Sequence, residues 1–292
     1  MQFVIAGTGY TGSRVLSALN DGVGIGRNPA DATPQDRFFA RDLDAPSIEP
    51  IRLDGRCALL YTIPPGRGPA GDMRLTRLID AINPSPQRFV YLSTTGVYGD
   101  RQAAMTDESI PRAPMSDRAK QRAASERQLL RACTEKDCDA VILRVPGIYG
   151  PGRLRLRQLR TGMPVLREQD AHPGSRIHVD DLVRCCIAAL QTATPPGIYN
   201  VGDGDFRSTT WFASKVAQLA GLAPPPTISR ETAERTLSPL RLSFLRESRK
   251  IDTTKMREVL GVIPHYEDPE EGIRASLNAE GIIKGDQLTD PK

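Results

Sequence analysis

The sequence lacks the residue patterns that metal centres and disulfide frameworks require. Its 292 residues include only three histidines and five cysteines, an odd number. No two cysteines stand in a C-x-x-C pair, and no cysteine–histidine spacing completes a zinc set. These absences argue against a zinc module and a disulfide scaffold. We therefore expect no metal site, and reduced thiols of the kind found in cytoplasmic proteins.

Long apolar runs and a strong charge bias are missing as well. No apolar stretch is long enough to span a bilayer, and the first residues lack the basic segment of a signal peptide. We therefore expect no membrane partner and no secretory leader. The net charge of +4 suits an anionic small-molecule substrate and does not require nucleic acid. The arginine-rich stretch at 153–160 also lacks the interleaved aromatic residues of a nucleic-acid platform.

What the sequence does contain is an alternation of strand-like and helix-like segments. Its length allows one large domain or two ordinary ones. Short apolar runs predict strands at 1–6, 22–26, 35–40, 57–63, 88–92, 140–145 and 197–201. Helical spacing predicts helices at 13–20, 73–82, 117–134, 179–191, 208–220 and 252–260. This alternation is typical of an α/β fold with a doubly wound parallel sheet.

The first predicted strand runs into a glycine-rich turn, GTGYTG at 7–12, with the spacing G-x-G-x-x-G. In such a turn the first glycine permits the tight bend, the second lets the backbone approach phosphates, and the third lets the next helix pack closely. That helix directs its N-terminal N–H groups at negative charge. We therefore predict a dinucleotide pyrophosphate here, held by Gly7, Gly9, Tyr10, Thr11 and Gly12. The alternative is a glycine-rich turn that binds no ligand.

Further segments, together with this turn, resemble one family, the extended short-chain dehydrogenase/reductases or NAD-dependent epimerase/dehydratase family. In chain order the segments are 7–12 (GTGYTG), 93–99 (STTGVYG), 143–152 (LRVPGIYGPG), 176–181 (RIHVDD), 198–202 (IYNVG) and 246–251 (RESRKI). The resemblance implies a Rossmann-type sheet with a smaller C-terminal substrate-binding lobe. We expect the NAD(P)-binding Rossmann domain at 1–150, with 176–203 returning to it. The substrate-binding lobe is then 151–175 and 204–292.

The cofactor choice depends on the residue after the second strand, which meets the adenosine ribose in this fold. A carboxylate there suits NAD, and an arginine suits the 2′-phosphate of NADP. Arg27 and Asn28 occupy this place, so we expect NADP in preference to NAD. The alternative is a solvated Arg27, with NAD or no dinucleotide bound. Further expected cofactor contacts, mostly implied by the resemblance, are Asp42 (which could equally cap a helix), Leu43, Thr62, Ile63, Pro64, Pro146, Gly147 and Ile148.

The resemblance also implies a Ser/Thr, a Tyr and a Lys as catalytic residues, the last two as Tyr-x-x-x-Lys on one helical face. Thr94 falls at the Ser/Thr position, but the helix after Pro114 has no tyrosine. One register puts Arg118 and Arg122 at the Tyr and Lys positions, and Glu126 supports it because the family often has an acid there. The rival register, Ser116 and Lys120, leaves that acid six residues away. We prefer the arginine pair.

This departure changes the expected chemistry, because arginine stays protonated and cannot act as a general base. Loss of a positioned acid or base typically costs about 10²–10⁴ in rate. Arg122 would then hold ribose or phosphate, and Arg118 would bind an anionic substrate or stabilise an oxyanion. The alternative is two solvated arginines. Tyr98 and Tyr149 are either substitute acids or packed aromatic residues.

The remaining candidates concern the substrate. We expect substrate contacts from Thr95, Tyr98, Tyr149, Arg153, Arg176 and His178. The Arg/Leu alternation at 153–160 either binds a diphosphate, as the resemblance implies, or presents a solvated basic face. Our main hypothesis is an NADP-linked oxidoreductase or epimerase/dehydratase acting on an anionic, phosphorylated or nucleotide-linked metabolite. The alternative is a catalytically silent dinucleotide-binding regulator. The family often dimerises through the helix carrying Arg118, which implies a possible homodimer.

Overall fold

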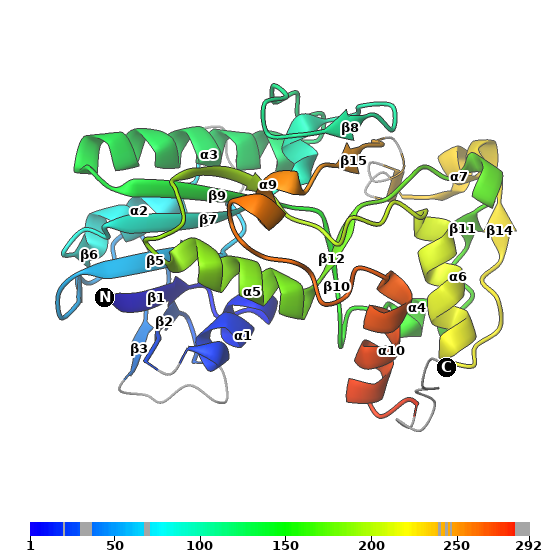
Figure 1. The fold of residues 1–292 in the computed structure, drawn as a ribbon, viewed down its shortest axis with the longest axis horizontal. Coiled ribbons are helices and arrows are strands. Elements are labelled where there is room, and N and C mark those ends of the chain that lie inside the picture. Colours follow the sequence, from blue (N-terminus) through cyan, green and yellow to red (C-terminus); the bar gives the residue numbers. More distant parts are fainter. Residues whose placement is uncertain are drawn as a thin grey trace.

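Seven parallel strands form the main sheet of the molecule, in the order β13-β9-β7-β5-β1-β2-β3 (Figure 1). This computed structural model describes residues 1–19, 21–29, 37–66, 71–238, 241–242, 245 and 247–283. The strands are β1 Gln2–Ala6, β2 Val23–Gly26, β3 Phe38–Ala40, β5 Cys57–Tyr61, β7 Arg88–Thr94, β9 Asp139–Val145 and β13 Gly197–Asn200. The strand order reverses between β1 and β5, which is where ligands bind in open α/β sheets. The predicted doubly wound parallel sheet is confirmed.

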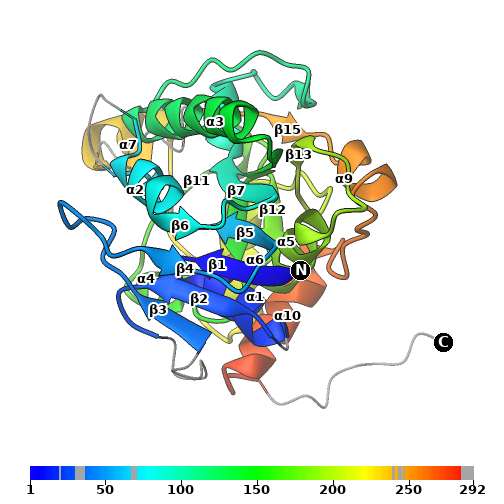
Figure 2. The ribbon, with the colours of Figure 1, turned by 90° about the vertical axis from the view of Figure 1, so that its left-hand side faces the viewer.

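Helices cover both faces of this sheet (Figure 2). On one face lie α1 (Tyr10–Ala18) and α5 (Val179–Leu190), and on the other lie α2 (Met73–Ala81) and α3 (Asp117–Lys136). Successive side chains of each strand point to opposite faces of the sheet and pack against the helices on either side. In β1, Ile5 belongs to the buried cluster of α1 and α5, whereas Val4 belongs to that of α2 and α3.

A smaller group of helices lies beyond the carboxyl ends of the strands, on the right in Figure 1. It contains α4 (Leu156–Arg160), α6 (Thr209–Leu219), α7 (Arg230–Thr236) and α10 (Pro269–Ala279). These helices, α7 excepted, share a hydrophobic cluster that includes Leu156, Val216 and Ile273. The division into a cofactor domain and a substrate lobe stays a prediction.

Four short parallel strand pairs lie outside the main sheet. The pairs are β10 Gly147–Tyr149 with β12 Arg176–His178, β11 Val165–Leu166 with β14 Thr227–Ile228, β8 Met105–Thr106 with β15 Lys250–Ile251, and β4 Ile51–Arg52 with β6 Ile82–Asn83. The 3₁₀ turns η2 (Thr95–Tyr98) and η3 (Glu168–Asp170) and the short helix α9 (Thr254–Glu258) complete the described elements. Among the described residues, no helix has the length and apolar character needed to cross a membrane.

Two predicted helices have other bounds than expected. The first helix begins at Tyr10 and not at residue 13, because Gly9 already serves as its N-cap. The helix expected at 252–260 is the shorter α9, which begins at Thr254 and ends at Glu258. The third strand, expected within residues 35–40, is Phe38–Ala40, and residues 35 and 36 lie outside the described residues.

Candidate functional site

The glycine-rich turn joins β1 to α1, and two of its glycines are required by the packing of the protein itself. Gly7 has a φ of +96°, and a Cβ atom on it would lie 2.6 Å from side-chain atoms of Thr62 and Ile63. A Cβ atom on Gly12 would lie 1.9 Å from the carbonyl oxygen of Gly7. Thr62 Oγ1 donates a 2.7 Å hydrogen bond to the same oxygen. Only glycine fits these two positions without a shift of the backbone.

Gly9 differs from its neighbours, because a Cβ atom there would meet no described atom within 4 Å. It is the N-cap of α1, which has neither a side-chain cap nor an acidic residue in its first turn. The free N–H groups of such a helix terminus attract anions. The open space at Gly9 and the uncapped helix therefore fit a dinucleotide pyrophosphate, which a side chain at this position would obstruct.

The two residues after Gly9 direct their side chains elsewhere. Thr11 is buried. Tyr10 donates a 2.9 Å hydrogen bond to the carbonyl of Pro151, and its ring contacts the guanidinium carbons of Arg14 and Arg153 at 4.0 and 3.8 Å from the centroid. Tyr10 and Thr11 can therefore meet a pyrophosphate through their backbone N–H groups. The same contact brings Arg153 next to the glycine-rich turn.

Positive charge collects at the end of β2, where the adenosine ribose was expected. Arg27 and Asn28 are exposed there. Arg74 binds the nearby Asp44 with two hydrogen bonds of 2.6 and 2.7 Å. The hydrogen bond from Arg74, together with the positive charges of Arg74, Arg27 and Arg77, lowers the pKa of Asp44. Arg74 is thus paired with a carboxylate, and the charges of Arg27 and Arg77 act on the same group, so that positive charge exceeds negative charge here.

The other predicted adenine contacts lie close by. Asp42 Oδ1 accepts the backbone N–H of Asp44 at 3.0 Å, so its side chain closes a local turn and does not cap a helix. Leu43 is buried, and its carbonyl accepts a hydrogen bond from Arg77 at 2.8 Å. Their contact with a cofactor stays a prediction.

Arg122 lies at the carboxyl edge of the sheet. Its Nη1 donates to the carbonyl of Leu92 at 2.8 Å, to the hydroxyl of Tyr91 at 3.1 Å and to the carbonyl of Ile63 at 3.4 Å. It therefore bridges the ends of β7 and β5, next to Pro64, whose carbonyl accepts from Arg74. Of the two registers considered for α3, the one that contains Arg122 reaches the predicted cofactor edge.

The lysine of the rival register lies on the surface. Ser116 is the N-cap of α3 and accepts the N–H of Ala119 at 3.3 Å. The Lys120 side chain is 60% exposed, and its Nζ lies 3.7 Å from Asp117. A lysine so placed cannot take the role expected of the family lysine at the ribose.

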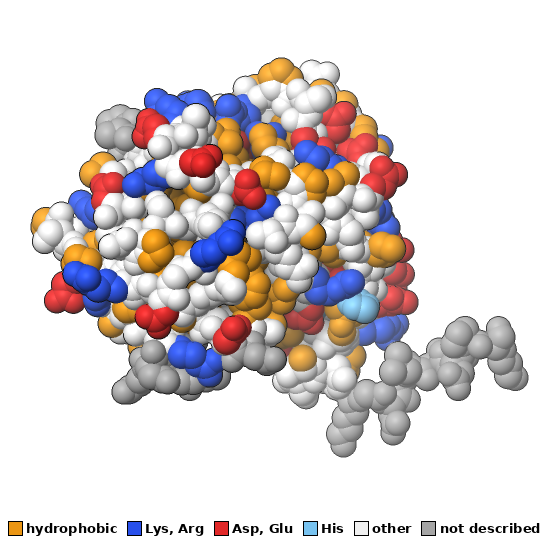
Figure 3. Space-filling model, turned by 60° about the vertical axis from the view of Figure 1, so that its left-hand side comes forward, with side chains coloured by type: hydrophobic (Ala, Val, Ile, Leu, Met, Phe, Trp, Pro, Cys, Tyr) orange, Lys and Arg blue, Asp and Glu red, His pale blue; other side chains and the backbone are white. Residues whose placement is uncertain are grey.

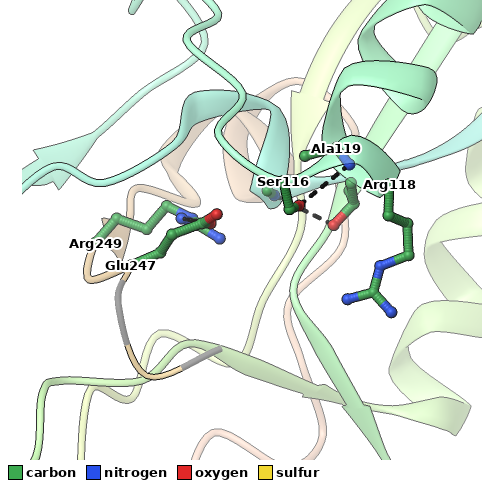
Figure 4. A pocket seen from close by; sticks show the side chains of 7 residues that line it. Ser116, Arg118, Ala119, Glu247 and Arg249 are labelled. Atoms are coloured by element: carbon green, nitrogen blue, oxygen red, sulfur yellow. Dashed lines mark hydrogen bonds and ion pairs between the residues drawn. The ribbon is translucent and has the colours of Figure 1, made fainter. Parts of the chain in front are cut away.

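A cavity of about 90 Å³ opens at the N-terminal end of α3, beside the end of β7 (Figure 4). Thr94, the last residue of β7, lies in its wall, and Thr94 Oγ1 accepts the N–H of Gly96 at 3.2 Å. Arg118 borders the cavity from α3. The remaining lining residues are Gly96, Ser116, Ala119, Glu247 and Arg249. The structure thus brings two predicted catalytic residues, Thr94 and Arg118, to one cavity.

Glu126 explains why α3 is held in this register. Its side chain is fully buried and accepts a 2.5 Å hydrogen bond from Ser93. Arg144 of β9, itself buried, donates to both carboxylate oxygens at 3.2 and 2.8 Å. Arg112 adds a bond of 3.1 Å. A buried carboxylate with three partners fixes the rotation and height of α3 against β7 and β9.

Four predicted substrate contacts are buried, and three of them are hydrogen-bonded within the protein. Thr95 lies in η2 at 4% exposure. Tyr98 donates to Asn200 Oδ1 at 2.7 Å. His178 shares a 3.1 Å hydrogen bond with Ser276 Oγ, and Arg176 donates to Asp205 at 2.7 Å and to the carbonyl of Arg207. These placements favour packing roles over contact with a substrate.

Tyr149 is also buried, and its hydroxyl has no hydrogen-bond partner among the described residues. Its ring packs edge-on against His178, with 5.1 Å between the centroids. Burial is the main cause that raises the pKa of Tyr149 far above its usual value. This environment favours a packed aromatic residue over a proton donor.

The remaining predicted residues lie on the surface near the strand edge. In the stretch 153–160 the leucines are buried and the arginines are exposed, the pattern of a solvated basic face. Gly147 of β10 is exposed, and Pro146 and Ile148 are half-buried beside it. Their contact with a nicotinamide stays a prediction.

The chain was compared with protein families and with known proteins. Residues 71–202 match the model of the NAD-dependent epimerase/dehydratase family. Over these residues the chain is similar to this family. It departs from the catalytic pattern that the resemblance implies, because α3 has no tyrosine.

Individual relatives are distant. The protein YeeZ of Escherichia coli (strain K12) is 28% identical over 173 residues, which are 58% of this chain and 61% of YeeZ. A conserved protein of unknown function from Silicibacter pomeroyi has a similar structure, with a TM-score of 0.78 and 28% identity over 96% of this chain and 99% of that one. UDP-glucuronic acid 4-epimerase from Bacillus cereus, solved with NAD, has a TM-score of 0.71 at 18% identity, covering 97% and 100% of the two chains. At that identity the likeness shows the fold alone.

Two charged residues of the cavity were missed by the sequence analysis. Glu247 and Arg249 come from the segment before β15, far along the chain from α3, which ends at Lys136. Their segment, 246–251, resembles the C-terminal region of the family, but that resemblance assigned no role to either residue. Residue 246 lies outside the described residues. The pairing of β15 with β8 and the hydrogen bonds of Ser248 and Arg249 with residues 99–103 bring this segment to the cavity.

Replacing Asp203 should change how stability depends on pH. Asp203 is 2% exposed, and its Oδ2 has no partner among the described residues. Burial, more than any other cause, raises its pKa to about 8, although Arg176 opposes the shift. The folded protein therefore keeps a proton that the unfolded chain releases near pH ~4, and the free energy of unfolding falls between pH ~4 and ~8. Asp203→Asn should remove this contribution and raise the Tm at the upper end of that range. Thermal melts of both proteins across the range test this, and an unchanged pH dependence would contradict it.

Proposed function

We propose that the protein is an NADP-linked oxidoreductase, or a sugar-nucleotide epimerase/dehydratase-like enzyme, that acts on an anionic metabolite, phosphorylated or nucleotide-linked. The observation that carries this proposal is Gly9, a glycine that the packing does not require but that a bound pyrophosphate would. The cavity at Thr94 opens at the same carboxyl edge of the sheet. The preference for NADP is supported by Arg27, Arg74 and Arg77 around the end of β2. The similarity of residues 71–202 to the epimerase/dehydratase family model supports a reaction of this kind.

Thr94, Arg118 and Arg122 would have different roles in this reaction. A bound nicotinamide dinucleotide would supply hydride transfer. Because Thr94 Oγ1 accepts from Gly96, its own hydroxyl hydrogen remains available to donate to a substrate oxygen. Arg118 places a permanent positive charge beside that oxygen, where it would stabilise developing negative charge. Arg122 lies at the ends of β5 and β7. There it would bind a ribose hydroxyl or a phosphate of the dinucleotide.

A second candidate function is a catalytically silent dinucleotide-binding regulator. The observation that favours it is the absence of tyrosine from α3, because neither Arg118 nor Arg122 can exchange a proton near neutral pH. Product analysis after incubation with NADP and a panel of sugar nucleotides separates the two functions. Turnover of any of them supports the enzyme.

We also propose a cytoplasmic location and a homodimer that forms through α3. The five cysteines are all free thiols in the structure, as expected in a reducing compartment. The resemblance to the family supports the dimer, and light scattering of the purified protein tests it.

Titration with NADP and NAD should raise the Tm, and NADP should do so at lower concentration. A ligand present at about 100 times its Kd adds about 2.7 kcal/mol to the free energy of unfolding. Arg27→Ala should weaken NADP binding by about tenfold, as expected for the loss of one charge-assisted hydrogen bond, and leave NAD unaffected. Arg52→Ala, at an exposed arginine of β4, is the matched control. No shift with either dinucleotide would refute both candidate functions, and an unchanged NADP-to-NAD ratio in Arg27→Ala would refute the assignment of Arg27.

A further inference from the structure

Two cysteines meet at the turn between α3 and β9. Cys133 lies in the last turn of α3, and Cys138 stands directly before β9. The turn is at the left in Figure 1, at the opposite end of α3 from the cavity of Thr94. The proposed function therefore gives neither thiol a role.

The way in which α3 ends brings the two side chains together. Asp137 has a left-handed backbone, with a φ of 51° and a ψ of 54°. The N–H groups of Asp137 and Cys138 both donate to the carbonyl of Cys133, the latter at 3.0 Å. The bond from Cys138 is the long hydrogen bond of a Schellman motif, in which the side chains of the two bonded residues frequently make contact. Accordingly, the two thiols are hydrogen-bonded to each other.

The surroundings of the two thiols differ. Cys133 is 3% exposed, whereas Cys138 is half-buried. The hydrogen bond from Cys133, and to a lesser extent the charge of Lys136, lowers the pKa of Cys138. The same hydrogen bond, together with burial, raises the pKa of Cys133. Since the thiolate is the reactive form of cysteine, Cys138 is the one that attacks an oxidant, and Cys133 is the neighbour that completes the reaction.

The space beside the pair suits a very small reactant. Both thiols line a cavity of about 10 Å³ together with Lys136, close to the volume that one water molecule needs. Figure 3 turns this side of the molecule toward the viewer, and basic, acidic and apolar side chains are interspersed on it. Hydrogen peroxide is small and uncharged, so that it matches this cavity and needs no charged patch to approach. The other three cysteines are buried.

We propose that Cys133 and Cys138 form a peroxide-sensitive dithiol that closes reversibly to a disulfide. The Cys138 thiolate attacks one oxygen of hydrogen peroxide, the O–O bond breaks, and the leaving hydroxide takes up a proton to become water. Cys133 then attacks the sulfur of the sulfenic acid, and the displaced hydroxide leaves with the thiol proton as a second water. Two electrons pass from the sulfur atoms to the peroxide. A dithiol reductant reverses the bond by exchange.

This site is independent of the proposed function, and tryptic mapping of the full-length protein tests it. Cleavage after Arg131, Lys136 and Arg144 puts the two cysteines on separate peptides, 132–136 (ACTEK) and 137–144 (DCDAVILR). The reduced protein is treated with a small excess of hydrogen peroxide and then alkylated in denaturant. We expect these two peptides to be joined by a disulfide, which dithiothreitol opens, and the other cysteines to be recovered alkylated.

Substitutions separate the roles of the two thiols. In Cys133→Ser the sulfenic acid of Cys138 lacks its partner, so that dimedone should label it. Cys138→Ser should react with peroxide at least about tenfold more slowly than the wild type, because the remaining thiol is buried and protonated. Cys57→Ser, at a buried cysteine of β5, is the matched control and should react as the wild type does.

The oxidised protein should also keep its fold. Because the two thiols are already in contact, the bond needs little movement of the backbone, and it restricts the unfolded chain. We therefore expect the Tm of the oxidised protein to equal or exceed that of the reduced protein. A clear fall in Tm would show that the bond forms only after the turn opens, which contradicts a preformed pair.

Three other results would overturn the proposal. The first is that the two peptides stay separate while peroxide oxidises free glutathione in a parallel sample. The second is a disulfide that joins Cys133 or Cys138 to Cys57. The third is that dimedone does not label Cys138 in Cys133→Ser. The linked peptides are measured on the wild-type protein, so that the test decides even if a variant fails to fold.

Discussion

Gly9→Ala is expected to abolish dinucleotide binding while leaving the unliganded protein as stable as before. A Cβ atom at residue 9 meets no described atom within 4 Å, and the φ of −78° is open to alanine. Alanine is a poorer N-cap than glycine, which destabilises the variant, whereas it lowers the entropy of the unfolded chain, which stabilises it. Each effect is about 1 kcal/mol or less, and the two oppose each other. A bound pyrophosphate, in contrast, would approach this atom directly. Thermal melts with and without NADP therefore separate the two effects, and we expect the NADP-induced shift to disappear.

Gly12→Ala is the contrasting variant. Its Cβ atom would lie 1.9 Å from the carbonyl oxygen of Gly7, so α1 must move away from β1 even without a ligand. We expect a lower Tm in the unliganded protein and lost NADP binding. If Gly9→Ala binds NADP as the wild type does, the turn does not hold a pyrophosphate. If instead Gly9→Ala melts as low as Gly12→Ala, the packing of the unliganded protein itself requires glycine at residue 9.

Glu126→Gln is expected to give the largest loss of stability among the substitutions considered. It removes the charge partner of Arg144, whose side chain is 2% exposed, across a contact of 2.8 Å. Breaking a buried ion pair on one side typically costs about 3–5 kcal/mol, because the remaining charge is left without compensation. For a chain of this size that corresponds to a fall in Tm on the order of 10 °C.

Two further variants show whether the loss comes from the buried pair. Glu49→Gln, at a surface carboxylate that is 81% exposed and pairs with Arg41, should leave the Tm unchanged. Adding Arg144→Met to Glu126→Gln should recover part of the loss, since no buried charge then lacks a counter-charge. A fall in Tm no larger than that of Glu49→Gln would show that the pair does not stabilise the fold.

The sheet was predictable because its signals are local. Each buried parallel strand is a short apolar run, and GTGYTG at 7–12 lies directly after the first of them. The start of α1 was misplaced by three residues because glycines disfavour helices in general, yet Gly9 is the N-cap and Gly12 lies inside the helix.

The predicted substrate residues show the limit of this reasoning. Tyr98, Tyr149 and His178 carry reactive groups in family-like segments, and nothing in their local sequence tells a buried side chain from an exposed one. In the fold, Tyr98 meets Asn200 and His178 meets Ser276, about a hundred residues away in each case. The first contact joins η2 to β13 and the second joins β12 to α10, so each depends on elements that only the tertiary structure brings together.

By itself, the sequence determined the doubly wound sheet, the glycine-rich turn and the loss of the family tyrosine, because strand periodicity, turn geometry and side-chain chemistry are properties of neighbouring residues. Tertiary structure alone decided that Arg122 reaches the ends of β5 and β7. It also decided that Glu126 forms an ion pair with Arg144 in the core and that Arg249 and Thr94 line the same cavity. The physical reason is that charged side chains interact according to their distance in space and not their separation in sequence. The pairing of β15 with β8 helps to set the distance between Arg249 and the other residues of the cavity.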